Sequence, residues 1–138
     1  MLYIGIDTGV HTGIAFWDSK EKAFSLVKTV KIHEAMQLVK QEAESRTQDD
    51  LRVIFEDARQ RKWFGNAGIE KLQGAGSVKR DCSIWEDYLK SLGCEFEMIP
   101  PMRNCTKLDS KMFGAITKYK GKTSEHARDA CMLVWDRK

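Results

Sequence analysis

Four side chains of the kinds that bind divalent cations come from three distant parts of the sequence, namely Asp7, Glu56, His126 and Asp129. Asp7 and Glu56 each close a run of β-favouring apolar residues. Near the C-terminus, His126 and Asp129 are three residues apart in a helical pattern, which places them on one side of that helix. Strand interiors disfavour Asp and Glu, so carboxylates at strand ends are informative. Taken singly, each is readily explained as a turn or surface residue, whereas the ordered set indicates chemistry.

Three carboxylates and one imidazole carry too much negative charge to gather without cations. Hard oxygen ligands select Mg²⁺ or Mn²⁺, and two such ions about 4 Å apart are a known arrangement for in-line phosphoryl displacement. Asp57 follows Glu56 directly, but neighbouring strand residues point to opposite faces, so only one of them can share a site with Asp7. We favour Glu56, and expect Asp57 to be exposed to solvent or to support the site from behind.

The segments that must position these residues follow in the order β-β-β-α-β-α-β-α-α, which predicts an α/β fold with a mixed five-stranded sheet and helices on its faces. The stretch 60–76 is expected to be a loop with a short helical piece. Ser77 is then a plausible N-cap for the clearest helix. The expected strands are Leu2–Asp7, Thr12–Asp18, Ala23–Val30, Leu51–Glu56 and Cys94–Ile99; the expected helices are Ile32–Ser45, Ser77–Leu92, Thr106–Tyr119 and one from about Ser124.

Apolar stripes accompany the last two helices. The third helix is expected to bury one containing Leu108, Met112 and Ile116, and the last helix one formed by Ala127, Ala130, Cys131 and Val134.

Composition bounds the class of protein. The chain has 138 residues, 42% of them apolar, and a formal charge of +3, which suits a single domain over residues 1–138. No apolar run approaches the roughly 20 residues needed to cross a bilayer, and the first residues do not resemble a secretory signal. The four cysteines form no C-x-x-C pair, so we expect reduced, mostly buried thiols, no structural zinc site and a cytoplasmic protein.

Basic residues gather in two segments, where each could neutralise a phosphate of a nucleic acid. Trp63 and Phe64 lie inside the first segment, where they could stack on an exposed base at a branch point or simply pack in the core. The first segment contains Arg59, Arg61, Lys62, Lys71, Lys79 and Arg80, and the second contains Arg103, Lys107, Lys111, Lys118, Lys120 and Lys122.

A second apolar stripe, Ile84 and Tyr88, lies beside the main stripe of the helix predicted at 77–92. Once the main stripe packs on the sheet, these two side chains could form a two-fold dimer interface. Alternatively, loops of the same chain cover them.

These motifs resemble, in order, those of the RuvC family of Holliday junction resolvases within the RNase H-like superfamily. Ile4–Gly9 with Thr12–Ala15 is similar to the first-strand motif, and Ile54–Glu56 to the second acidic motif. Gly74–Gly76 resembles the small-residue entry to the dimer helix, and His126–Ala130 the closing motif. The resemblance covers essentially the whole chain.

The resemblance implies an endonuclease that resolves four-way DNA junctions as a homodimer, with two Mg²⁺ (or Mn²⁺) ions per active site. Asp7, Glu56, His126 and Asp129 would be the metal ligands. Lys107 or Lys111 would be the basic residue near the cleaved phosphate. The chain departs from the family pattern at Asp57, and around residues 100–101, where the two prolines leave the choice of lysine open.

Other interpretations stay open beside this one. A non-cutting nucleic-acid-binding module of the same fold is the main alternative that is not an enzyme, and an RNase H-like nuclease for RNA or other branched DNA is the main alternative enzyme. Asp7-Thr8-Gly9 also matches the aspartic protease triplet, but those proteins are almost entirely β. The same turn resembles that of actin-like ATPases, which require two domains and a much longer chain.

Overall fold

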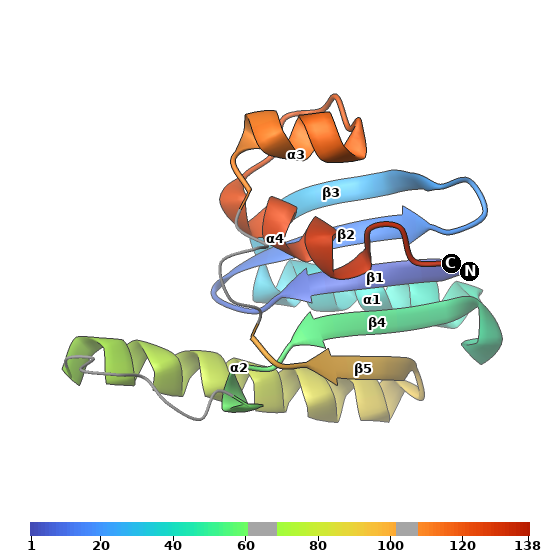
Figure 1. The fold of residues 1–138 in the computed structure, drawn as a ribbon. Coiled ribbons are helices and arrows are strands. Elements are labelled where there is room, and N and C mark those ends of the chain that lie inside the picture. Colours follow the sequence, from blue (N-terminus) through green and yellow to red (C-terminus); the bar gives the residue numbers. More distant parts are fainter. Residues whose placement is uncertain (61–68, 102–107) are drawn as a thin grey trace.

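A mixed five-stranded sheet forms the centre of the molecule (Figure 1). The computed structural model describes residues 1–60, 69–101 and 108–138, with the side chains of 69–75 left aside. The strand order is β3-β2-β1-β4-β5, with β2 antiparallel to both β1 and β3, and with β1, β4 and β5 parallel. This confirms the predicted α/β class. The strands are β1 (Leu2–Asp7), β2 (His11–Asp18), β3 (Ala23–Lys31), β4 (Leu51–Glu56) and β5 (Glu95–Ile99).

Helices cover both faces of the sheet, α1 and α2 on one side and α3 and α4 on the other (Figure 1). None of the helices in the described part is long and apolar enough to cross a membrane. The elements that complete the fold are α1 (Ile32–Ser45), α2 (Ile69–Leu92), α3 (Ser110–Thr117), α4 (Glu125–Val134) and the short 3₁₀ turns η1 (Gln48–Asp50) and η2 (Ala58–Gln60).

Two apolar layers follow from the alternation of side chains along β1 and β4. Ile4, Ile6 and Val53 pack with Trp85 of α2 on one face. Ile54 packs with α3 and α4 on the other. Because both faces are covered, β1 is apolar almost throughout, and β4 is apolar apart from the exposed Arg52 until Glu56. Asp7 and Glu56, each at a strand end, are the points at which these runs stop.

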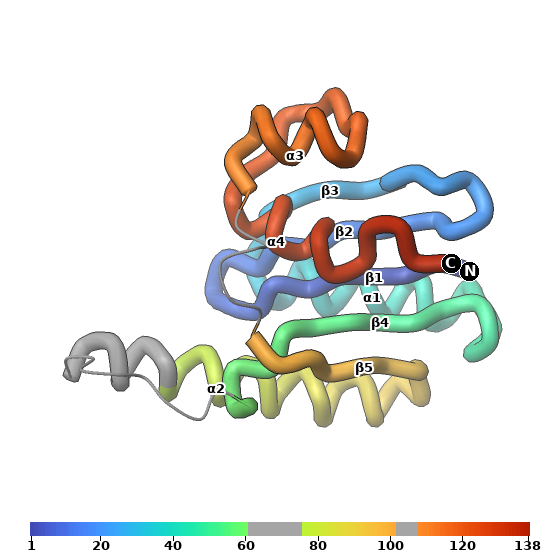
Figure 2. The backbone as a smooth tube through the Cα atoms, viewed as in Figure 1, coloured from blue at the N-terminus to red at the C-terminus, as the bar shows by residue number. Residues whose placement is uncertain are grey.

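The two chain termini lie side by side at the end of the sheet where β1 begins (Figure 2). The hydroxyl of Tyr3 donates to the carbonyl of Lys138 at 2.8 Å, and the indole N–H of Trp17 donates to the carbonyl of Arg137 at 2.9 Å. These bonds fix the segment after α4 against β1 and β2. Asp7 and Glu56 lie at the opposite end of the sheet, where β1 and β4 finish.

Helix α2 is longer than predicted. It begins at Ile69, so Ser77 lies inside the helix and does not cap it. The predicted start of this helix is wrong because Gly74 and Gly76, although glycine is more typical of loops, lie inside the helix. A glycine inside a helix costs about 1 kcal/mol relative to alanine, and a long helix tolerates that cost.

Of the apolar residues predicted for the third helix, Leu108 packs against the core, but Met112 and Ile116 do not. The side chain of Phe113 is buried, whereas Met112 and Ile116 are 51% and 42% exposed. Helix α3 begins later than expected, after Asp109, whose carboxylate caps it by accepting from the backbone N–H of Met112 at 2.8 Å. It ends at Thr117, because Lys118 adopts a left-handed conformation. In contrast, the buried stripe predicted for α4 is confirmed.

The backbone of α4 packs directly on β1 and β2 at two glycines. A Cβ atom placed on Gly5 would overlap with the carbonyl oxygen of Ala130, and one on Gly13 with the carbonyl oxygen of His126. Gly13 is also the strand partner of Asp7 across the β1–β2 pair. The absence of a side chain at Gly13 therefore lets the first turn of α4 lie next to Asp7.

We expect Gly13→Ala to destabilise the protein by more than about 2 kcal/mol, because neither backbone segment can yield to the added methyl group. Urea unfolding of both proteins measures the difference. Gly76→Ala is the matched control, since a Cβ there meets no atom within 4 Å. That control should be neutral or more stable by up to about 1 kcal/mol. Equal stability of Gly13→Ala and the parent protein would contradict this account of the packing.

Candidate active site

Asp7 and Glu56 lie beside each other at the ends of two parallel neighbouring strands. The register pairs Gly5 with Ile54 and Ile6 with Phe55, so Asp7 and Glu56 come next on strands that are about 4.8 Å apart. Gly5 and Ile54 face α4. Because side chains two residues apart share a face, Asp7 and Glu56 also project toward the α4 side.

The first turn of α4 brings an imidazole to Asp7. Nδ1 of His126 lies 2.9 Å from Oδ2 of Asp7, a contact between residues 119 positions apart. Ser124 begins the helix by accepting from the backbone N–H of Ala127 at 3.3 Å, and its hydroxyl is also hydrogen-bonded to that of Thr29 on β3. The cap thus fixes both the start of α4 and the position of His126.

Asp129 lies one turn further along the same side of α4 and is half-buried. Its neighbour Arg128 binds the preceding segment instead. Its guanidinium donates to the carbonyl of Leu108 at 2.8 Å and to that of Thr123 at 2.9 Å. These bonds tie α4 to the segment that precedes it.

Asp7, Glu56, His126 and Asp129 are of types that bind divalent cations, but the described side chains are not arranged around a single metal position. Among the described residues, no three His, Cys, Asp or Glu side chains are close enough to hold a metal ion. Within the predicted ligand set, Asp7 and His126 are in direct contact. Carboxylate oxygens and one imidazole form a donor set that suits Mg²⁺ or Mn²⁺.

Asp57 points to the opposite side of the sheet, so of its two expected placements, in solvent or behind the site, exposure to solvent is wrong. It is 4% exposed, and its backbone N–H donates to the carbonyl of Ile99 on β5 at 2.7 Å. Its Oδ1 accepts from Nε of Arg59 at 2.7 Å. Burial alone would raise the pKa of the Asp57 carboxyl, but hydrogen bonds from Arg59 outweigh burial and hold the pKa below its usual value.

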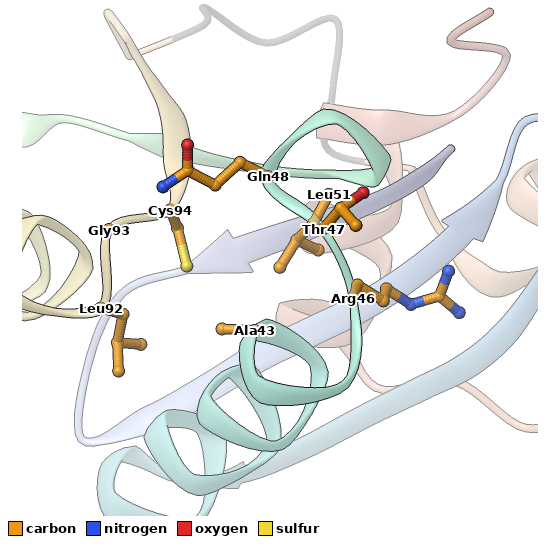
Figure 3. Close-up of a pocket in the computed structure, with 8 residues that line it drawn as sticks. All are labelled: Ala43, Arg46, Thr47, Gln48, Leu51, Leu92, Gly93 and Cys94. Atoms are coloured by element: carbon orange, nitrogen blue, oxygen red, sulfur yellow. The ribbon is translucent and has the colours of Figure 1, made fainter.

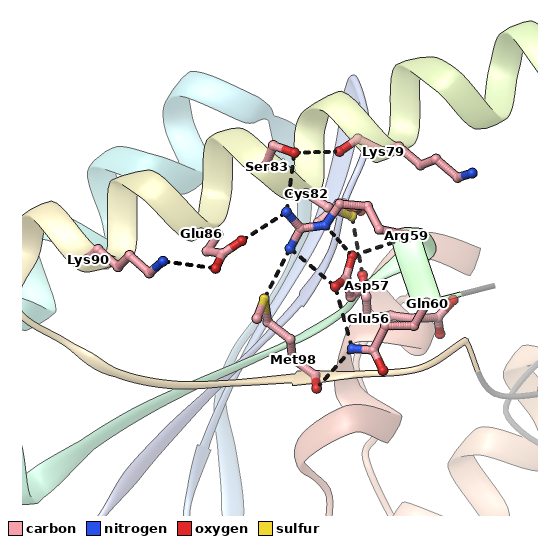
Figure 4. A network of polar contacts seen from close by, with 11 residues as sticks. Glu56, Asp57, Arg59, Gln60, Lys79, Cys82, Ser83, Glu86, Lys90 and Met98 are labelled. Carbon is pink, nitrogen blue, oxygen red and sulfur yellow. Dashed lines mark hydrogen bonds and ion pairs between the residues drawn. The ribbon is translucent and has the colours of Figure 1, made fainter. Parts of the chain in front are cut away.

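The guanidinium of Arg59, a residue predicted to contact DNA, is bound by two carboxylates of its own chain (Figure 4). Besides Asp57 it contacts Oε1 of Glu86 on α2 at 2.8 Å and donates to the hydroxyl of Ser83 at 3.2 Å. The side chain is 29% exposed. The sequence does not predict these ion pairs, because the charge of Arg59 alone does not show which carboxylates it will contact in the fold.

Cys82 connects α2 to the strand ends that carry the two carboxylates. Its sulfur lies 3.6 Å from the carbonyl oxygen of Glu56 and 3.5 Å from the hydroxyl oxygen of Thr8. Burial raises the pKa of the Cys82 thiol, so it stays protonated and donates to Glu56. No local pattern of the sequence indicates this contact between α2 and the end of β4.

Other predicted residues fall in three groups. On α2, Lys79 is half-exposed and Arg80 exposed, and Lys111 is exposed on α3. Ile84 is 42% exposed, whereas Tyr88 is half-buried and its hydroxyl donates to the carbonyl of Met36 at 3.1 Å. Outside the described residues lie Arg61, Lys62, Trp63, Phe64, Arg103 and Lys107.

A small cavity lies at the other end of the sheet, between η1, α1 and the start of β5 (Figure 3). Its volume of about 30 Å³ has room for about one water molecule. Arg46, Gln48 and Cys94 are among the residues that line it. It holds no cluster of carboxylates, so it does not compete with the strand-end site as a centre of metal-dependent chemistry.

Comparison with solved structures identifies the architecture. A structure of T. thermophilus RuvC in complex with Holliday junction substrate superposes with a TM-score of 0.57 at 16% sequence identity, over 99% of this chain and 92% of that chain. The fold is RNase H-like. No protein-family model matches the sequence, and a search of curated proteins found no match. The likeness to that structure therefore concerns the course of the chain.

We expect Ser124→Ala to cost about 1 kcal/mol of stability, because it removes the cap of α4 and the bond to Thr29. Ser124→Asp should retain most of the stability, since Asp is an equally good cap. Ser91→Ala is the control, because Ser91 is exposed near the end of α2 and its hydroxyl donates only to Tyr88. Urea unfolding of the three variants tests this. If Ser91→Ala lost as much stability as Ser124→Ala, the loss in Ser124→Ala could not be assigned to the cap of α4.

Proposed function

We propose that this protein is a metal-dependent endonuclease that cuts four-way DNA junctions in recombination and repair. The observation that carries the proposal is the contact between Asp7 and His126, beside Glu56, at the end of the sheet. The contact joins two segments 119 residues apart, and the pairing of β1 with β4 adds the strand that ends at Glu56. The fold is shared with a RuvC bound to Holliday junction substrate. The order of these residues along the chain is the same as in the motifs that the sequence resembles.

Asp7, Glu56, His126 and Asp129 would hold Mg²⁺ or Mn²⁺, two ions per active site. Bound ions of this kind make a water molecule nucleophilic and offset the charge that develops on the phosphate. With Nδ1 of His126 held by Asp7, Nε2 is the nitrogen that can accept or give a proton. Lys107, or Lys111 on α3, would add a positive charge near the cleaved phosphate.

The basic residues on α2 and α3 would hold the DNA backbone. Lys79 and Arg80 precede Cys82, whose sulfur contacts the carbonyl of Glu56, so this part of α2 passes close to the proposed site. The other residues proposed to contact DNA are Arg61, Lys62, Trp63, Phe64 and Arg103. A homodimer through the exposed side of α2 that carries Ile84 would place two such sites on the two equivalent strands of a junction.

A non-cutting nucleic-acid-binding module is the second candidate. One observation favours it: among the described residues, no three metal-binding side chains are assembled. The two candidates differ in one experiment, incubation of the protein with synthetic four-way, three-way and linear duplexes with and without Mg²⁺. Symmetric nicks only in the four-way species support the resolvase. Binding without nicks supports the module.

We expect Asp7→Asn to abolish nicking of the four-way junction while leaving its affinity within about threefold. The reason is that the change removes a charged ligand from the centre of the site but no contact with the DNA backbone. Gel assays of cutting, and binding assays in Ca²⁺, measure the two properties. Asp49→Asn, at an exposed residue of η1, is the control and should cut normally. A variant Asp7→Asn that still nicks the junction in Mg²⁺ refutes the assignment.

Lys111→Ala should weaken junction binding and lower the slope of log affinity against log salt by about one unit, because each lost phosphate contact releases about one counterion fewer. Arg80→Ala should have the same effect. Lys40→Ala is the control, because Lys40 is exposed on α1 and paired with Glu44 at 3.9 Å. Titrations at several salt concentrations provide the slopes. Slopes unchanged in both variants would remove these residues from the DNA interface.

A further inference from the structure

Arg59 joins three elements behind the proposed site. Its guanidinium binds Asp57 at the end of β4 and Glu86 on α2, and its Nη2 lies 3.2 Å from the sulfur of Met98 on β5. Gln60 adds a weaker contact, with its side-chain amide 3.4 Å from Oδ2 of Asp57 and from the carbonyl of Met98. Figure 4 shows this group of residues, which we call the Arg59 cluster, packed between η2, α2 and β5.

Cys82, Ile99 and the Arg59 cluster together fix the backbone on which Glu56 stands. The carbonyl of Glu56 accepts from Cys82, and the next peptide N–H, that of Asp57, donates to Ile99. The Asp57 carboxylate is held on the α2 side by Arg59. Because consecutive strand residues point to opposite faces, holding Asp57 there directs Glu56 to the face that carries Asp7.

We propose that Arg59 is a positioning residue, which through Asp57 and Glu86 holds Glu56 in place to bind a divalent cation beside Asp7. This inference rests on the proposed function. It differs from the sequence-based expectation for Arg59, which was contact with DNA. Substitution of residues that support metal ligands typically costs 10- to 100-fold in metal affinity or activity.

A second arginine of the chain provides a matched control. Arg46 is also bound by two carboxylates, Glu42 and Asp50, at 2.8 Å each, and is 33% exposed. Asp50 precedes β4, whereas Asp57 follows it, so the two arginines stand at opposite ends of the same strand. Arg46→Gln therefore removes a comparable pair of ionic contacts without disturbing Glu56.

The experiment compares Mn²⁺ binding by the full chain, by Arg59→Gln and by Arg46→Gln, measured by electron paramagnetic resonance without DNA. We expect Arg59→Gln to weaken Mn²⁺ binding about tenfold and Arg46→Gln to change it less than twofold. In junction nicking, kcat of Arg59→Gln should fall about tenfold while the affinity for the junction in Ca²⁺ stays the same. Thermal unfolding of both variants shows whether their stabilities are matched.

Arg59→Lys and Glu86→Gln keep the test decisive if Arg59→Gln does not fold. Lysine retains the charge but presents a single point of contact instead of a fork, so it should recover only part of the Mn²⁺ affinity. Glu86→Gln leaves the Asp57 contact intact and should have a smaller effect than Arg59→Lys.

Two outcomes would overturn the inference. Equal Mn²⁺ affinity in Arg59→Gln and Arg46→Gln would mean that Arg59 does not position a metal ligand. Weaker junction binding with a lower salt slope and unchanged kcat would make Arg59 a DNA contact. A full-length protein that binds Mn²⁺ in an Arg59-dependent way but cuts no junction would refute the proposed function and leave the positioning role standing.

Discussion

The close approach of α4 to the sheet is the constraint on which the rest of the site depends. The carbonyl oxygens of Ala130 and His126 occupy the space that side chains at Gly5 and Gly13 would take. Ala127, Ala130 and Cys131 are small residues on the buried face of α4. They let the helix backbone approach β1 and β2 more closely than large side chains would at these positions. Since Gly13 is the strand partner of Asp7, the same contact sets the distance from Asp7 to His126.

The sheet also separates two neighbouring negative charges at the end of β4. Glu56 and Asp57 point to opposite faces, and Arg59 neutralises Asp57 on the α2 side. Without that partner, a carboxylate that is nearly fully buried would cost several kcal/mol or would take up a proton. The arrangement leaves Glu56 directed to the α4 side of the sheet, the side on which Asp7 contacts His126.

The sequence predicted most of the elements, because each follows from a local pattern. The convergence of Asp7 with His126 follows instead from the ordered set of ligand-type residues and its resemblance to the RuvC motifs. Strand bounds such as Leu51–Glu56 and the α4 stripe depend only on periodicity within one element. It failed where the answer depends on a second element. Phe113 rather than Met112 is buried because of how α3 lies on α4, and Arg59 meets Glu86 because α2 passes behind η2. Neither fact is encoded in the spacing of one segment.

The hydrogen bond between Asp7 and His126 also bears on how such a site persists without a cation. Asp7 is 23% exposed and stands next to Glu56, so two carboxylates would repel each other if neither had a partner. The imidazole gives Asp7 a partner at 2.9 Å and keeps its carboxylate oriented toward α4. A net hydrogen bond is worth about 1 kcal/mol, much less than the attraction between a divalent ion and several carboxylates. Under the proposed function, the Asp7–His126 contact would therefore add little to the cost of binding a cation, while keeping both side chains in position.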